Sequence, residues 1–305
     1  PGSVFKPFVY TTALDNGYPV TEQLLNQPVV LNVQNVDGSW VKWKPQNYDG
    51  STGGLTTLRE GLRKSMNLIS VRMVQQDIAP SEQVKRTAQR MGITTDIRAV
   101  DALALGTSEV FPLEIVSAYA AFANQGVYSK PFPITRVEDR YGNVIKEFYP
   151  ERKEVLSEET TYLMTSLLQT VMDRGTGGSA RWKYKFNRPA AGKTGTTQGW
   201  SDAWFVGFTP QIAAGCWFGV DDFRVPLGPG QDGSISALPA WARFMKGAHD
   251  TLDFPIQKFE KPSGIHDIEI CSVTKKAPVP ACPVEKEIFK VGTEPIQKCK
   301  VHRTQ

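Results

Sequence analysis

Apolar residues recur at helical spacing through most of this chain. The pattern predicts helices over residues 3–14, from about 56, and over 68–78, 81–91, 112–124, 158–174 and 237–249. Ser157 is placed to cap one of these helices, and glycines follow several of them at Gly92, Gly126 and Gly175. Helices therefore dominate the first half of the sequence.

Strand patterns are concentrated in two places. Residues 29–43 alternate around the pair Asp37-Gly38, which predicts a hairpin. Residues 203–220 are eighteen consecutive uncharged residues, but Thr209-Pro210-Gln211 interrupts them, so they predict two buried strands, 203–208 and 212–220, rather than a membrane span. Many helices with antiparallel strands late in the chain predict an α+β fold.

Composition narrows the class of protein. The chain has 305 residues, 40% of them hydrophobic, with 35 basic and 31 acidic residues that leave a net charge of +4. This balance is typical of a globular protein, and no basic run interleaved with aromatic residues indicates a nucleic-acid partner. No segment of the sequence is predicted to be a signal peptide or a membrane anchor.

Three of the four cysteines, Cys271, Cys282 and Cys299, lie in a proline-rich tail. Such clustering indicates an oxidising compartment. Three cysteines allow three single pairings, of which we favour a Cys271–Cys282 disulfide. A zinc site is disfavoured, because no C-x-x-C or H-x-x-x-H spacing occurs near His266 and His302.

The sequence Ser3-Val4-Phe5-Lys6 matches the pattern S-x-x-K at the start of a predicted helix. There the helix dipole favours negative charge near Ser3, and Lys6 shares a helix face with it. The pattern also occurs at 39–42 and 272–275. The first of these copies lies on a predicted strand, where the two residues point to opposite faces, and the second lies in the tail.

Two further motifs each occur once, Ser65-Met66-Asn67 (S-x-N) and Lys193-Thr194-Gly195 (K-T-G). With Ser3 and Lys6 they describe a serine nucleophile, its base and an anion-binding strand. Gly192-Lys193-Thr194 could also end a phosphate-binding P-loop. That interpretation fails because Asn187 stands where a glycine is needed and no helix is predicted after the threonine.

These motifs, in this order, resemble those of the penicillin-interacting serine enzymes. Within that group the chain looks like the transpeptidase domain of class A penicillin-binding proteins, the bifunctional peptidoglycan synthases, through residues 1–8, 43–48, 175–177 and 192–197. One departure is Gln198-Gly199-Trp200, where shorter polar residues are expected.

The resemblance, which covers nearly the whole chain, implies a fold and two domains. A central antiparallel sheet is expected to be flanked by helices, with an all-helical subdomain. Residues 1–261 would form the transpeptidase domain without its N-terminal strands, and 262–305 a small C-terminal β extension. We therefore expect a sheet edge that is either completed by a second polypeptide or left open.

The resemblance also implies residue roles. Ser3 would be the nucleophile and Lys6, if neutral, its base. Ser65 would relay a proton to the leaving amine, with Lys193 biasing it, and Asn67 would hold the substrate amide and steady Lys6. The oxyanion would bind the backbone N–H groups of Ser3 and Thr196. The residues expected to bind the substrate are Thr194, Gly195, Thr196 and Thr197.

The implied activity is that of an extracytoplasmic D,D-transpeptidase that uses no metal and no cofactor. It would cross-link peptidoglycan stem peptides from donors ending in D-Ala-D-Ala, react with β-lactam antibiotics and have D-Ala-D-Ala carboxypeptidase side activity. A glycosyltransferase domain and a membrane anchor are expected upstream. The alternatives are a β-lactam-sensing domain and a serine β-lactamase, although no Glu-x-x-x-Asn lies between Asn67 and Lys193.

Overall fold

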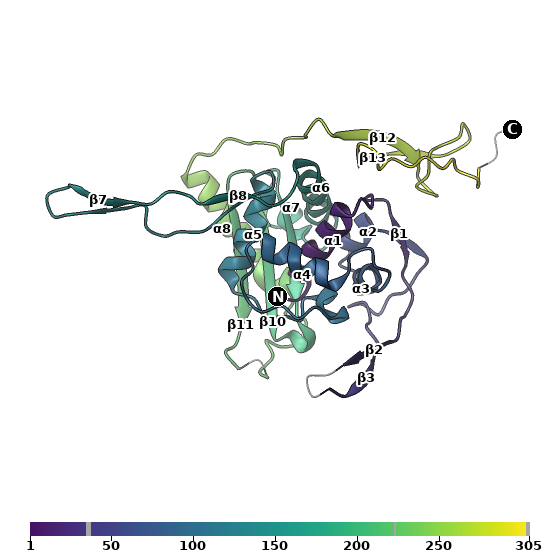
Figure 1. The fold of residues 1–305 in the computed structure, drawn as a ribbon, viewed down its shortest axis with the longest axis horizontal. Helices are drawn as coiled ribbons and strands as arrows, with labels where there is room; N and C mark the ends of the chain where they lie inside the picture. The colour runs from purple at the N-terminus through teal and green to yellow at the C-terminus, as the bar shows by residue number, and fades with distance from the viewer. Residues whose placement is uncertain (35–37, 223, 303–305) are drawn as a thin grey trace.

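A three-stranded antiparallel sheet lies at the centre of the molecule (Figure 1). It is built from β9 (Ala191–Thr196), β10 (Asp202–Phe208) and β11 (Ala213–Gly219) in the order β11-β10-β9. The computed structural model describes residues 1–34, 38–222 and 224–302. Within these ranges β11 pairs only with β10, so the described residues do not close the sheet, as predicted.

Side chains of β10 alternate between two hydrophobic layers, as expected of a strand covered on both faces. Phe208 points into the larger core and contacts Tyr119 of α5 (Pro112–Ala123) edge to face. Phe205 points the other way and packs on Trp241 of α8 (Leu238–Thr251). The sheet therefore lies between helices, and the predicted α+β class is confirmed.

Helix α1 (Lys6–Asp15) passes through the middle of the larger core. It follows the short 3-10 helix η1 (Gly2–Phe5) and is buried from its first residue to Leu14. A helix that is buried all round must be surrounded by other elements, here α6 (Glu158–Arg174), α3 (Asn67–Gln75) and α4 (Ser81–Arg90). Its first turn is thus fixed in position.

The predicted helices agree with the observed ones. The Ser157 hydroxyl caps α6 by accepting a hydrogen bond from the Thr160 N–H, as the sequence predicted. The predicted hairpin at 29–43 is present, with its Asp37 turn outside the described residues. The remaining helices are α2 (Leu58–Arg63), α7 (Ser179–Trp182), η2 (Asp101–Leu105), η3 (Gln198–Trp200) and the π-helical η4 (Gly233–Ala237).

Several short strands were not predicted. In the body of the molecule (residues 1–261) these are β1 (Gln23–Leu25) with β4 (Leu55–Thr57), β5 (Val127–Ser129) with β8 (Arg152–Glu154), and β6 (Arg136–Glu138) with β7 (Val144–Glu147). The fourth two-stranded sheet of the body, β2 (Leu31–Gln34) with β3 (Trp40–Trp43), is the predicted hairpin. The β6–β7 hairpin projects away from the body (Figure 1). Its strands are exposed on both faces, so they lack the alternation that reveals a half-buried strand. In the described parts of the chain, no helix combines the length and apolar character needed to cross a membrane.

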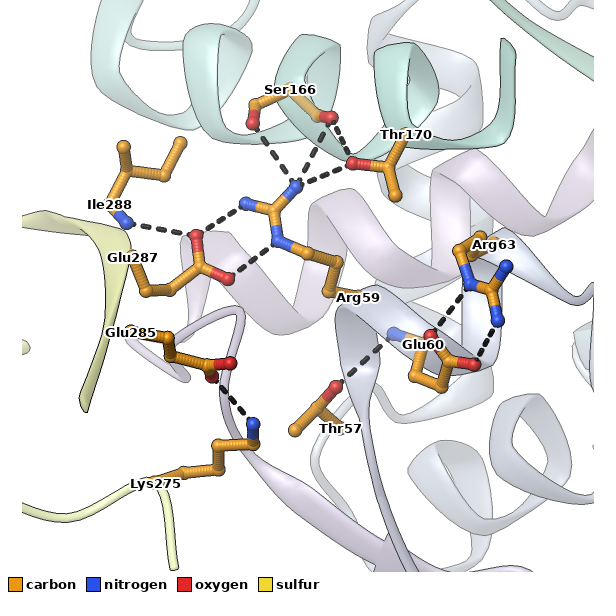
Figure 2. A network of polar contacts seen from close by, with 10 residues as sticks. All are labelled: Thr57, Arg59, Glu60, Arg63, Ser166, Thr170, Lys275, Glu285, Glu287 and Ile288. Atoms are coloured by element: carbon orange, nitrogen blue, oxygen red, sulfur yellow. Dashed lines mark hydrogen bonds and ion pairs between the residues drawn. The ribbon is translucent and has the colours of Figure 1, made fainter. Parts of the chain in front are cut away.

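The C-terminal extension forms a two-stranded sheet, β12 (Ile265–Cys271) with β13 (Val284–Lys290). It runs along one side of the body, over α6 (Figure 1). An ion pair joins β13 to α2: Arg59 donates two hydrogen bonds to the Glu287 carboxylate, at 2.6 and 2.7 Å (Figure 2). The same guanidinium donates to the Ser166 carbonyl and to Thr170 on α6. Each member of the pair is only 13% exposed.

We expect Glu287→Ala to release the extension from the body. The substitution leaves the Arg59 charge largely buried without its partner, which costs about 3 kcal/mol. In limited proteolysis, the extension of the variant is cleaved faster than that of the parent chain. The matched control is Glu285→Ala, two residues away, which removes a more exposed pair with Lys275 (Figure 2) and costs less than about 1 kcal/mol. Equal cleavage of both variants would contradict the assignment.

Candidate active site

The turn that carries Ser3 packs directly against the end of β9. Gly2 has φ +56°, and a Cβ atom at this position would lie 2.7 Å from the Thr196 carbonyl oxygen. On the opposite side, a Cβ atom at Gly195 would lie 2.6 Å from the Pro1 carbonyl oxygen. Glycine at both positions therefore allows η1 and β9 to approach this closely.

Lys6 lies one turn after Ser3 and is completely buried. Its Nζ donates hydrogen bonds to Asn67 Oδ1 and to the Ser65 carbonyl, both at 2.7 Å, and contacts Ser65 Oγ at 3.4 Å. Burial, and then the nearby charge of Lys193, hold the pKa of Lys6 well below its usual value. Among the described residues no hydrogen bond joins Lys6 to the Ser3 hydroxyl.

Lys193 reaches the same point from β9 and is also completely buried. Its Nζ donates to Ser65 Oγ at 2.7 Å and to the Thr194 carbonyl at 3.0 Å. Burial lowers the pKa of Lys193 to about 7. The Ser65 hydroxyl therefore lies between two lysine side chains whose pKa values are both depressed.

Ser65 and Asn67 are held by the connection between α2 and α3. Ser65 has φ +56°, an unusual conformation for a residue with a side chain, which costs about 1 to 3 kcal/mol. Asn67 is the first residue of α3, and its side-chain N–H donates to the Gln46 carbonyl at 2.7 Å. The chain thus holds both polar groups toward the lysines at a cost in backbone strain.

The threonines at the end of β9 differ in what their hydroxyl groups contact. Thr194 shares a 2.7 Å hydrogen bond with Thr176, so this pair keeps one proton to donate. Thr196 Oγ1 accepts from the Gly233 N–H at 3.2 Å and keeps its own proton. Thr197 Oγ1 donates to Asp202 at 3.0 Å. Thr196 and the Thr194–Thr176 pair are therefore better placed than Thr197 to donate to an anion.

One cleft of about 560 Å³ collects these groups. The predicted site residues that line it are Ser3, Ser65, Asn67, Thr194, Thr196 and Thr197. Lys6 and Lys193 lie beneath its surface, and Gly195 packs against η1 behind it. Ser39 and Ser272, the serines of the two other S-x-x-K copies, do not line the cleft. A second cleft, of about 700 Å³, lies between the body and the extension and contains none of the motif residues.

Sequence reasoning assigned no chemistry to several residues of the site. Thr176 follows Gly175, the glycine after a predicted helix, and its hydroxyl contacts Thr194. Tyr48 lines the cleft, and its hydroxyl accepts a 3.1 Å hydrogen bond from the Trp200 indole. Trp200, which departs from the expected pattern, therefore joins the segment after β9 to residues before α2. Tyr48 and Thr176 lie in the segments 43–48 and 175–177, whose resemblance to penicillin-binding proteins could have identified them.

The cysteines of the extension are arranged differently from the prediction. All four cysteines of the chain are free thiols, so the favoured Cys271–Cys282 disulfide is not formed. Instead Cys271, Cys282 and Cys299 surround His302, while His266 is not part of the group. The overlooked signal was the two-residue spacing between Cys299 and His302. Neither C-x-x-C nor H-x-x-x-H includes a pair made of one cysteine and one histidine.

Known proteins match nearly the whole length of this chain. Residues 1–221 match the family model of the penicillin-binding protein transpeptidase domain, and residues 261–304 match that of the penicillin-binding protein 1A C-terminal domain. The chain is 36% identical over 301 residues to penicillin-binding protein 1A of Aquifex aeolicus (strain VF5), covering 98% of this chain and 40% of the relative. It is 31% identical over 344 residues to that of Pseudomonas aeruginosa, covering 95% and 40%. The chain thus spans about two fifths of the length of these relatives.

Solved structures agree in fold. The crystal structure of penicillin-binding protein 1A from Haemophilus influenzae matches with a TM-score of 0.88 at 29% identity, over 98% of this chain and 48% of that one. PonA1 from Mycobacterium tuberculosis, in complex with penicillin V, matches with a TM-score of 0.70 at 24% identity, over 86% and 72%. The first match extends over both the body and the extension.

The packing of η1 on β9 makes a testable prediction. If Ser3 is the nucleophile that the sequence predicts, we expect Gly2→Ala to slow its acylation by benzylpenicillin about 100-fold, because the new methyl group pushes Ser3 away from Thr196. The matched control is Gly17→Ala, which has a similar positive φ but open space around its Cβ position. It loses about 1 kcal/mol of stability but keeps its acylation rate, measured by stopped-flow competition. Equal rates in the two variants would show that the contact does not position Ser3.

Proposed function

This chain belongs to the penicillin-binding protein transpeptidase family, in its class A penicillin-binding protein 1A branch, and we propose that it is a D,D-transpeptidase that cross-links peptidoglycan stem peptides. The observation that carries the proposal is the position of the Ser65 hydroxyl, 2.7 Å from Lys193 Nζ and 3.4 Å from Lys6 Nζ, beside the cleft that contains Ser3. Acyl transfer needs a nucleophile, a base, a proton donor and an oxyanion site, and these groups can supply all four.

Acylation begins at Ser3. Its Oγ bonds to the carbonyl carbon of the penultimate D-Ala, and the neutral amine of Lys6 takes the hydroxyl proton. Depression of the Lys6 pKa supports this role, since a base must be unprotonated at working pH. The backbone N–H groups of Ser3 and Thr196 bind the oxyanion, and one such donor is worth about 3 kcal/mol of barrier.

Breakdown of the tetrahedral intermediate expels the terminal D-Ala. The carbon–nitrogen bond breaks, Ser65 gives its proton to the leaving amine, and Lys6 returns a proton to Ser65. An amine from a neighbouring strand then attacks the Ser3 ester and loses its proton along the same route in reverse, which frees Ser3. If water replaces the amine, the product is that of a carboxypeptidase.

Substrate binding uses the walls of the cleft. The side-chain amide of Asn67 holds the peptide, and its hydrogen bond to Lys6 also fixes the base. The terminal carboxylate of the donor binds the hydroxyl groups of Thr196 and of the Thr194–Thr176 pair beside Lys193. Gly195 contributes close packing rather than a side chain, and Thr197 acts through Asp202.

The proposal extends to the whole protein. Relatives of this chain are more than twice its length. Because class A penicillin-binding proteins are bifunctional peptidoglycan synthases, we infer that this chain works outside the cytoplasm beside a glycosyltransferase domain, on a protein with a membrane anchor. We assign residues 1–261 to the transpeptidase domain and 262–305 to the extension. No metal or cofactor takes part in the steps above.

Benzylpenicillin tests the function directly. It presents a strained carbonyl and a carboxylate in the arrangement of an acyl-D-Ala-D-Ala end, so we expect a stable ester on Ser3. Intact-mass spectrometry detects the adduct on the parent chain and none on Ser3→Ala. Lys6→Ala slows its formation by about 100-fold or more through loss of the base. The matched controls Ser39→Ala and Ser272→Ala leave it unchanged.

Each other outcome has a meaning. An adduct that forms and is quickly lost would identify a β-lactamase instead. An adduct that persists without any transfer of a D-Ala-D-Ala peptide to an amine acceptor would favour a sensing domain. No adduct in a folded sample would overturn the assignment.

The two lysines predict a bell-shaped pH profile. The rate constant for acylation by benzylpenicillin rises with pH as Lys6 loses its proton. The rate constant falls above about pH 7, because Lys193 then loses the charge with which it biases the Ser65 hydroxyl toward proton transfer. Lys193→Arg is expected to remove the falling limb, because a guanidinium stays protonated. A profile of the parent chain without any decline on the alkaline side would contradict the role given to Lys193.

A further inference from the structure

The extension brings three thiols and one imidazole to a single point. Cys271 ends β12, Cys282 lies just before β13, and Cys299 and His302 lie in the segment after β13. His302 Nδ1 is 3.3 Å from Cys299 Sγ, 3.4 Å from Cys282 Sγ and 3.6 Å from Cys271 Sγ. All four atoms lie within 4.8 Å of one another.

We propose that Cys271, Cys282, Cys299 and His302 form a structural zinc site of the Cys₃His type. In tetrahedral zinc sites the metal lies about 2.3 Å from sulfur and 2.0 to 2.1 Å from nitrogen, which makes each sulfur–nitrogen edge about 3.5 Å long. The three observed distances fall on both sides of this value. Thiolate sulfur and imidazole nitrogen are the ligands that zinc prefers.

A disulfide explains the cluster less well. It would bring two sulfur atoms to about 2.05 Å and use two of the three thiols. The third thiol and the His302 nitrogen would then have no reason to lie at the same point. A shared ion accounts for all four groups together, including the nearly equal distances from His302 to each sulfur atom.

The surroundings of the sulfur atoms fit a closed site. The Val279 N–H donates to Cys282 Sγ at 3.3 Å, and the Thr274 N–H donates to Cys271 Sγ at 3.5 Å. Such donors stabilise thiolate ligands. Cys271 and Cys299 are buried, and Cys282 and His302 are half-buried. Four protein ligands with little access for solvent indicate a structural rather than a catalytic metal.

A bound metal would add stability that the few buried apolar side chains of the extension do not provide. A two-stranded sheet alone is marginally stable, and folded segments of about 40 residues or fewer usually need a metal or disulfides. The buried apolar side chains of the two strands are few, chiefly Ile265, Ile270 and Phe289. The ion would tie the loop 272–283 and the segment 291–302 to the sheet that carries Glu287, and so support the ion pair with Arg59 (Figure 2).

Metal analysis of the intact chain tests the proposal. The protein is prepared with a phosphine reductant and zinc, and unbound metal is removed by gel filtration. Plasma mass spectrometry is expected to find about one zinc per chain. Cobalt(II) in its place gives the intense thiolate charge-transfer and d–d bands of a tetrahedral site.

Matched substitutions locate the metal. Cys282→Ser and His302→Ala each remove one ligand and are expected to lower zinc affinity by more than the roughly tenfold loss typical of an outer-shell substitution, so that a competing chelator lowers their zinc occupancy. Cys216→Ser in β11 and His266→Ala in β12 remove the same chemical groups outside the cluster and keep full occupancy. Unchanged occupancy in both ligand variants would overturn the assignment.

A second measurement avoids variants that fail to fold. In the parent chain, zinc is expected to protect Cys271, Cys282 and Cys299 from maleimide, and a chelator to expose them, while labelling of Cys216 stays constant. Peptide mapping assigns each site. Labelling that does not respond to the chelator, or a disulfide between two of the three cysteines in the zinc-treated protein, would overturn the proposal.

Discussion

Two buried lysine side chains constrain the arrangement of the elements around them. Lys6 and Lys193 have 0% exposure, and burial of a charged amine costs several kcal/mol unless polar atoms replace the lost water. The replacing atoms come mainly from Ser65 and Asn67, in the connection between α2 and α3. The lysines themselves come from α1 and β9. The helical subdomain must therefore dock on the sheet for either lysine to be tolerated.

The burial that costs stability also changes the acid–base properties of the two lysines. Burial depresses the pKa of both lysines, so an amine that water would keep protonated can become a base. Backbone strain at Ser65 adds to the cost, and it places a hydroxyl between the two amines. A protein selected for stability alone would fill this volume with apolar side chains. The buried polar groups and the strained residue thus mark the site more clearly than the shape of the cleft does.

The extension meets the body through Ile265 and Ile288, which pack with the larger core, and through a few polar contacts. Its sheet meets the body through the Arg59–Glu287 pair, and its loops converge on His302. Point contacts of this kind fix the geometry of a segment that buries too little apolar surface to fold by itself. They also make the segment sensitive to single substitutions, which the larger body tolerates better.

Hydrophobic periodicity in the sequence was enough to predict the main helices, the β10–β11 pair and the α+β class, because these features depend on neighbouring residues. The three motifs were enough to select Lys6, Ser65, Asn67 and Lys193, whose polar groups the structure brings together. The exposed β6–β7 hairpin, the contact of Thr176 with Thr194 and the grouping of three cysteines around His302 were decided by the tertiary structure alone. Each of these joins residues that are separated along the chain or lack a buried face, so local spacing carries no record of them.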